Sequence, residues 1–156
     1  MYSWLVFVHL VGVFGFLMSH GVATFVAFRV RAEKDVSALR TLLALSGRSG
    51  AAMNVSLLVL LAGGISAAIV AHISRGWPLA ALVVLIVVSG LMSAFPGRQL
   101  RKIRVAAGFT GRITVTGEAK SDELATSQSA FSPWFSVITG GAGLAIILWL
   151  MVFKPF

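Results

Sequence analysis

This sequence contains four long runs without Asp, Glu, Lys or Arg, and these runs constrain the fold more than any other feature. They lie at about residues 2–28, 51–74, 77–95 and 134–153. An α-helix needs about 20 apolar residues to cross the hydrocarbon core of a bilayer, so each run is long enough to span it. We therefore expect an all-α fold: a polytopic membrane protein with a four-transmembrane-helix bundle, in which residues 1–156 form a single domain.

The composition supports a membrane protein and excludes several kinds of chemistry. Hydrophobic residues make up 58% of the chain and charged residues 12%, about half the charged fraction of a soluble domain. The chain has no cysteine, which excludes disulfides, thiolate metal sites and cysteine nucleophiles. The first run has no basic residue before it and is about twice as long as the apolar part of a signal peptide, so we expect it to remain as a span.

The formal net charge of +8 is distributed between the apolar runs. Membrane topology therefore explains the charge better than a nucleic-acid partner does. The loops at about 29–50 and 96–133 contain eleven Lys and Arg residues, whereas Arg75 and Lys154 lie on the other side. Cytoplasmic loops carry the excess of positive charge in multi-pass proteins. We expect both loops to be cytoplasmic, and both termini and the turn at Arg75 to be non-cytoplasmic.

Amphipathic patterns indicate short helical segments in both cytoplasmic loops. Asp35 precedes apolar residues at helical spacing up to residue 45, which predicts a short helix at the membrane surface with Asp35 as its N-cap. Residues 99–107 alternate basic and apolar side chains. This pattern fits either a basic helix on an anionic leaflet or a solvated continuation of the third helix.

Prolines and glycines mark further boundaries. Pro96-Gly97 is expected to end the third helix, and Pro133, after Ser132 as N-cap, is expected to open the fourth. The β-branched residues between Gly111 and Gly117 favour an extended segment, to which we assign no function.

Small residues recur at helical spacing in all four runs. Because the hydrophobic effect does not drive helices together in lipid, close backbone approach through small side chains holds them. We expect packing at such positions, which include Gly12, Gly15 and Ser19 in the first run, Gly63, Ala67 and Ala71 in the second, Gly90 and Ala94 in the third, and Gly141 and Ala145 in the fourth.

The polar residues inside the runs are the candidates for function. The lack of charge there argues against a proton pump, a voltage sensor or a carboxylate-coupled transporter. His9 and His20 are eleven residues apart, which places them on one helix face but about 16 Å apart along the axis, too far to share a metal ion. His72 lies near the outer end of the second run, and Asn54 near its inner end.

Neutral imidazole is the common ligand of haem iron, and a four-helix bundle can hold a b-type haem between histidines on facing helices. His9, His20 and His72 are therefore candidate haem ligands, with Gly12 leaving space for the porphyrin edge. In the alternative interpretation, His9 and His20 form hydrogen bonds to serine or backbone groups across the bundle, and His72 is an interfacial residue. Asn54 is expected to form an interhelical hydrogen bond.

Four short segments in the first part of the chain resemble a known group of proteins. They are His9-Leu10-Val11-Gly12, Ser19-His20-Gly21-Val22-Ala23, Phe28-Arg29-Val30-Arg31-Ala32-Glu33 and Leu43-Ala44-Leu45-Ser46. These segments resemble small uncharacterised bacterial four-span membrane proteins, which are more distantly similar to copper-resistance-D-type membrane proteins. The resemblance covers mainly residues 5–65 and implies a bacterial plasma membrane.

In some members of the wider group, histidines of the first helix bind haem or metal. The resemblance thus implies a ligand role for His9 and, less directly, for His20. This sequence departs from such a site because the pattern fixes no second charged or sulfur ligand, and Met18 lies about 180° around the helix from His9.

Three hypotheses arise from the sequence. The first is a non-catalytic accessory subunit of a larger membrane assembly, respiratory or redox, with membrane-protein partners or a second copy of the chain. The second is a b-type haem-binding protein for electron transfer or haem handling. The third is a small-molecule or metal permease, which the absence of buried charge disfavours. We expect no catalytic residue and no dedicated metal site, because no positioned acid, base or nucleophile stands beside the histidines.

Overall fold

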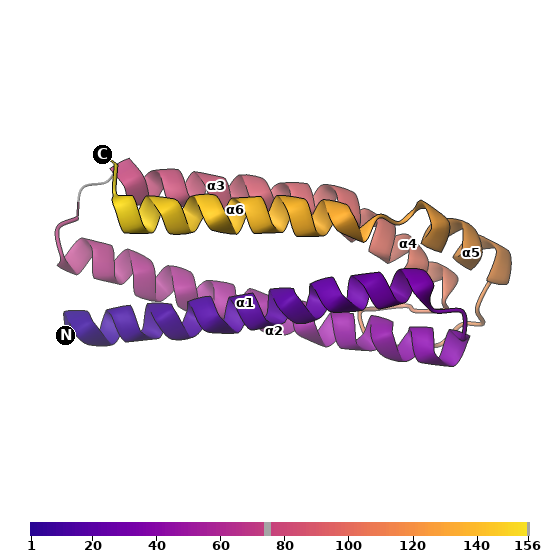
Figure 1. Ribbon diagram of the computed structural model, residues 1–156. Coiled ribbons are helices and arrows are strands. Elements are labelled where there is room, and N and C mark those ends of the chain that lie inside the picture. Colours follow the sequence, from indigo (N-terminus) through magenta and orange to yellow (C-terminus); the bar gives the residue numbers. More distant parts are fainter. Residues whose placement is uncertain (74–75, 156) are drawn as a thin grey trace.

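The computed structural model describes residues 1–73 and 76–155, and their regular structure is helical. Within these residues, four helices are long and apolar enough to cross a membrane, which confirms the all-α, four-span prediction. They are α1 (Tyr2–Ala32), α2 (Val36–Val70), the continuous helix Gly76–Ala106, and α6 (Pro133–Phe153). A short helix, α5 (Ser121–Ala130), precedes α6. Figure 1 shows both termini at one end of the bundle and α5 at the other.

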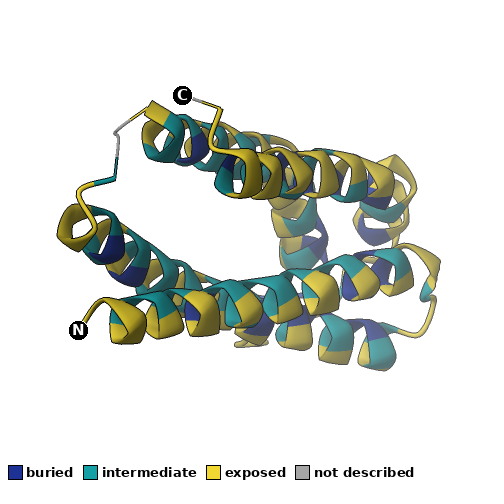
Figure 2. Cartoon of the chain, turned by 60° about the vertical axis from the view of Figure 1, so that its left-hand side comes forward, coloured by how far each residue is buried: buried dark blue, intermediate teal, exposed yellow. Residues whose placement is uncertain are grey.

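The four long helices form two pairs rather than one closely packed bundle. α1 packs along α2, and the helix that begins at Gly76 packs along α6, whereas the backbones of the two pairs come close mainly where α1 meets α6. Figure 2 shows the pairs lying apart over much of their length. We call the end that contains α5 and the link after α1 the basic end, because most of the described Lys and Arg residues lie there.

Glycines bring α1 and α2 into backbone contact. Gly12 is buried directly against the backbone of Leu60, and Gly63 is buried against the backbone of His9. A side chain at either glycine would separate the helices. Further along, the Ser49 hydroxyl donates a hydrogen bond to the Ser19 carbonyl at 2.6 Å. The structure thus confirms the predicted small-residue packing for this pair.

The first two helices are longer than the sequence runs predicted. The expected surface helix at residues 35–45 and the expected second span form one helix, α2, so the link from α1 is reduced to Glu33–Asp35. Asp35 caps α2 as predicted, because its carboxylate accepts from the backbone N–H groups of Ser37 and Ala38 at 3.2 and 3.0 Å. Near residue 70 the helix ends, and the predicted turn at Arg75 lies outside the described residues.

Pro96 does not end the third helix, contrary to the prediction. The helix widens at Ser93–Gly97 into a π-helical turn, η1, between α3 (Gly76–Met92) and α4 (Arg98–Ala106). The proline ring clashes with the carbonyl four residues earlier in a regular α-helix, and a wider turn relieves this clash. Residues 99–107 therefore continue the third helix, but Ile103 on α4 is buried in a core rather than solvated.

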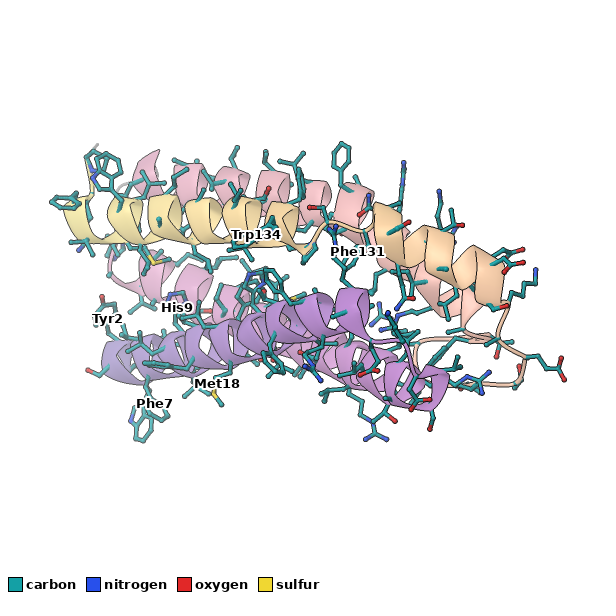
Figure 3. All side chains as sticks on the ribbon, turned by 45° about the vertical axis from the view of Figure 1, so that its right-hand side comes forward. Tyr2, Phe7, His9, Met18, Phe131 and Trp134 are labelled. Carbon is teal, nitrogen blue, oxygen red and sulfur yellow. The ribbon has the colours of Figure 1, made fainter. Side chains whose placement is uncertain are left out.

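The main apolar core lies at the basic end, where α1, α2, α4 and α5 meet. Phe131, at the C-terminal end of α5, is its largest fully buried side chain and is 1% exposed. Figure 3 shows Phe131 between α5 and the α1/α2 pair. The segment after α4 contributes Phe109, which forms an isolated bridge with Val115 in place of the expected longer extended segment. The other members of this core include Val26, Val30, Leu39, Leu43, Ile103 and Leu124.

Side chains from neighbouring elements cap the C-termini of three helices around this core. The last carbonyls of a helix have no partner within it. Gln128 donates to the Val30 and Glu33 carbonyls after α1, at 2.7 and 2.9 Å. Arg40 donates to the Ala107 carbonyl after α4 at 2.9 Å. Arg31 donates to the Phe131 carbonyl after α5 at 2.8 Å.

We expect Arg40→Gln to loosen this end of the protein. The substitution removes the guanidinium that donates to the Ala107 and Gly117 carbonyls. The shorter glutamine side chain leaves the buried Ala107 carbonyl without this donor, and an unsatisfied buried polar group costs about 1–3 kcal/mol. Hydrogen–deuterium exchange in residues 106–120 should accelerate. Arg48→Gln is the control, because Arg48 is exposed. Equal exchange in both variants would contradict the capping role of Arg40.

Candidate functional site: the cavity between the helix pairs

A cavity of about 1450 Å³ separates the two helix pairs. We call it the central cavity. Its walls come from both pairs and from the basic end, so no single element encloses it. Its lining includes Phe16, His20 and Thr24 from α1, Met53, Asn54 and Leu57 from α2, Leu85, Val88 and Ser89 from α3, and Ser136, Gly140, Leu144 and Ile147 from α6.

The cavity is bounded by the few contacts between the pairs. Phe28 of α1 meets Trp134 of α6 edge to face, with ring centroids 5.2 Å apart. About two helical turns along α1 from this contact, His20 meets Gly140 of α6. Within the α3/α6 pair, Gly143 packs against Val88. The expected packing positions Gly90 and Gly141 were wrong, because no atom of the described structure lies within 4 Å of a Cβ at either.

His20 is the histidine that lies on the wall of the central cavity. Its ring stacks on Phe16, with centroids 6.3 Å apart and an interplanar angle of 1°. The edge that carries Cε1 and Nε2 covers Gly140 so closely that a Cβ there would lie 2.7 Å from both atoms. A ligand can therefore reach Nε2 only if the ring turns away from α6.

His9 lies elsewhere, in the contact between α1 and α2 (Figure 3). Its Nδ1 is 2.8 Å from the Leu60 carbonyl oxygen, so a protonated Nδ1 donates to this oxygen. The ring lies against Gly64, where a Cβ would be 2.7 Å from Nδ1. The alternative interpretation of the sequence predicted such a hydrogen bond from His9 to a backbone group of another helix.

The remaining candidate residues, His72, Gly12 and Asn54, do not complete a ligand site with His9 or His20. His72 is exposed in the link after α2, with φ 50°, about 12 Å beyond Gly64 at ~1.5 Å per residue. The expected porphyrin space at Gly12 is occupied by the backbone of Leu60. Asn54 lines the central cavity and forms no hydrogen bond with the described part of the chain. Residues 1–73 and 76–155 contain no cluster of three His, Cys, Asp or Glu residues suited to a metal ion.

Basic side chains line the cavity at its basic end. They are Arg101, Lys102, Arg104 and Arg112, accompanied by Asp122 and Glu123. The sequence predicted a basic surface at residues 99–107, but not that these residues would line a cavity. The available signal was the basic pattern of residues 99–107. It could not identify a site because the position of α4 depends on the turn at Pro96.

Arg104 differs from the other three because it is tied to the protein. It lies on α4, beyond the apolar run, and donates to the Leu43 carbonyl at 2.7 Å and to the Arg112 carbonyl. Its guanidinium also stands 5.8 Å from the centre of the Phe109 ring. An arginine remains protonated at neutral pH, so this end of the cavity stays positive.

Comparison with protein-family models, curated proteins and solved structures finds no significant match to this chain.

We expect Gly140→Ala to displace the His20 ring. The new Cβ would clash with Cε1 and Nε2, and overpacking of this kind costs about 1–3 kcal/mol. The ¹⁵N chemical shifts of the His20 imidazole should change in histidine-labelled protein, and the melting temperature should fall. Gly141→Ala is the matched control, because a Cβ at Gly141 meets no atom within 4 Å of the described structure. Unchanged His20 shifts in Gly140→Ala would contradict the contact.

Proposed function

We propose that this protein is a non-catalytic integral membrane protein that holds an amphipathic ligand between its two helix pairs, and that it acts as an accessory subunit of a larger membrane assembly. The observation that carries the proposal is the central cavity of about 1450 Å³, whose walls come from both pairs. Pockets for small ligands usually measure about 300–1,000 Å³. The cavity therefore has room for a large amphipathic molecule.

The lining supports binding better than catalysis. Within the spans its polar groups are hydroxyls, the Asn54 amide and the His20 imidazole. A catalytic site needs a nucleophile or base positioned against a second group that activates it. His20 instead stacks on Phe16 and covers Gly140. The charged residues lie at the basic end, where they can attract and orient a charged ligand.

A b-type haem is the alternative ligand, and the observed arrangement does not fit one between two histidines. His9 is held against α2 by its bond to Leu60, and His20 presents its Nε2 edge to α6. A haem iron would need His20 to rotate and a second ligand from another source. The haem proposal therefore requires a conformation that differs at His20, and an absorption spectrum distinguishes the two ligands.

The distribution of charge supports a proposed orientation. Most basic side chains of the described residues lie at the basic end, and Lys154 comes after α6 at the other end. By the rule that cytoplasmic segments hold the positive excess, we place the basic end in the cytoplasm and both termini outside, in a bacterial plasma membrane.

Leu57→Trp tests the function of the cavity. Leu57 lines the cavity, and a larger side chain there should lower the affinity for the ligand about 5- to 160-fold, because overpacking costs about 1–3 kcal/mol. The protein is extracted in a mild detergent, and mass spectrometry identifies the amphipathic molecules that remain bound to wild type and variant.

Leu58→Trp provides the control, because Leu58 is 68% exposed on the outer surface of α2. We expect it to retain the ligand like the wild type. Equal retention by both tryptophan variants would contradict binding in the cavity. Reduced-minus-oxidised absorption bands of a b-type haem in the same sample would favour the haem alternative.

A further inference from the structure

We propose that the ligand of the central cavity is a phospholipid with an anionic headgroup, taken from the leaflet at the basic end. Its headgroup binds at Arg101, Lys102 and Arg112, and its acyl chains lie between the helix pairs. This inference rests on the proposed function, since it names the chemical class of the ligand that the cavity holds.

Three cations at the basic end of the cavity have no partner in the described part of the chain. Arg101, Lys102 and Arg112 line the cavity and are exposed. Their side chains form no hydrogen bond or ion pair with residues 1–73 or 76–155, in contrast to Arg104, which binds two carbonyls. These charges are therefore free to bind an anion, and each Lys or Arg near a membrane surface favours anionic lipid by about fivefold in affinity.

Two carboxylates lie at the same end and reduce the positive charge without cancelling it. Glu123 accepts a hydrogen bond from Lys120 at 3.1 Å, so its charge is offset by a residue that does not line the cavity. Asp122 is exposed on the first turn of α5. The four basic residues of the lining therefore exceed the acidic charge, and the headgroup that fits this end is an anion.

The part of the cavity inside the membrane is lined by apolar side chains. Leu57, Leu85, Leu144 and Ile147 face it from three of the four long helices. Along the continuous helix from Leu85 to Arg101 the cavity extends about 24 Å at ~1.5 Å per residue. One leaflet, half of a bilayer about 40–45 Å thick with its headgroups, measures about 20–22 Å. The cavity therefore matches one lipid molecule in length and in the order of its apolar and charged parts.

The size of the cavity favours a lipid over a small soluble anion as its ligand. Inorganic phosphate or a soluble phosphate ester would occupy the basic end and leave the apolar part between the pairs unfilled. Because lipid tails are as apolar as the side chains around them, the helix pairs gain little from closing this space themselves. A two-chain lipid fills both parts at once, and its phosphate replaces water around the three free cations.

Native mass spectrometry of the full-length protein in detergent tests the inference. The protein is titrated with dioleoyl phosphatidylglycerol and, separately, with dioleoyl phosphatidylcholine, which has the same chains but no net charge. We expect tighter binding of phosphatidylglycerol. The double variant Arg101→Gln/Lys102→Gln should weaken it about 25-fold, about fivefold for each charge removed, and should leave phosphatidylcholine binding unchanged.

Arg29→Gln/Arg48→Gln is the matched control, because it removes the same charge from two residues that do not line the cavity. We expect this variant to bind phosphatidylglycerol like the wild type. An equal loss in both double variants would overturn the headgroup site, because it would show attraction by net charge alone. Glycerol 3-phosphate at millimolar concentration should not displace the lipid, and full displacement would overturn the inference in favour of a free phosphate ester.

Leu57→Trp separates the failure of this inference from the failure of the proposed function. If both lipids bind equally to the wild type and Leu57→Trp weakens both, the anionic preference is wrong but the cavity still binds an amphipathic ligand. If Leu57→Trp leaves the binding of both lipids unchanged, the inference and the proposed function are both wrong.

Discussion

The carbonyl groups at the C-termini of α1, α4 and α5 are the constraint on which the rest of this structure depends. A helix cannot satisfy its last carbonyls itself, and burying them without donors is costly. Here Gln128, Arg40 and Arg31 supply the donors, and each lies on a different element from the helix that it caps. Positive side chains are also favoured at helix C-termini by the helix dipole. Together with the core around Phe131, these bonds join the two helix pairs at one end.

The central cavity is a consequence of this one-ended connection. Gly12 and Gly63 let α1 and α2 touch along their length, and Gly143 does the same for α3 and α6. Between the pairs, however, contacts such as Phe28–Trp134 and His20–Gly140 lie toward the joined end. In a bilayer, apolar surfaces gain little by leaving lipid, so nothing forces the pairs to close beyond these contacts. The remaining space combines apolar walls with a positively charged end, which is the basis for the proposed amphipathic ligand.

Much of the fold could be predicted from the sequence because the bilayer imposes a length and a composition on each span. The four apolar runs, the Asp35 cap and the α1/α2 glycine contacts were all predictable in this way. The prediction at Pro96 was wrong, because whether a proline ends a helix or widens it depends on the residues after it, and here Ile103 anchors the continuation in the core. The expected surface helix at residues 35–45 was not separate from the second span, since α2 runs through both without a break.

The candidate site was harder to predict because it arises where helices do not touch. Helical spacing could group His9 with His20 but could not show that one contacts α2 and the other α6. Positive charge in the loops indicated topology, whereas the distinction between Arg40, which caps a helix, and Arg101, which faces the cavity, depends on tertiary contacts.

Double electron–electron resonance between spin labels on the two helix pairs tests their separation most directly. The chain has no cysteine, so labels can be attached at Leu57→Cys and Leu144→Cys, with the protein in lipid nanodiscs. A narrow distance distribution, longer than that of labels on directly packed helices with axes about 8–10 Å apart, is the predicted result. A distribution typical of directly packed helices would contradict the cavity.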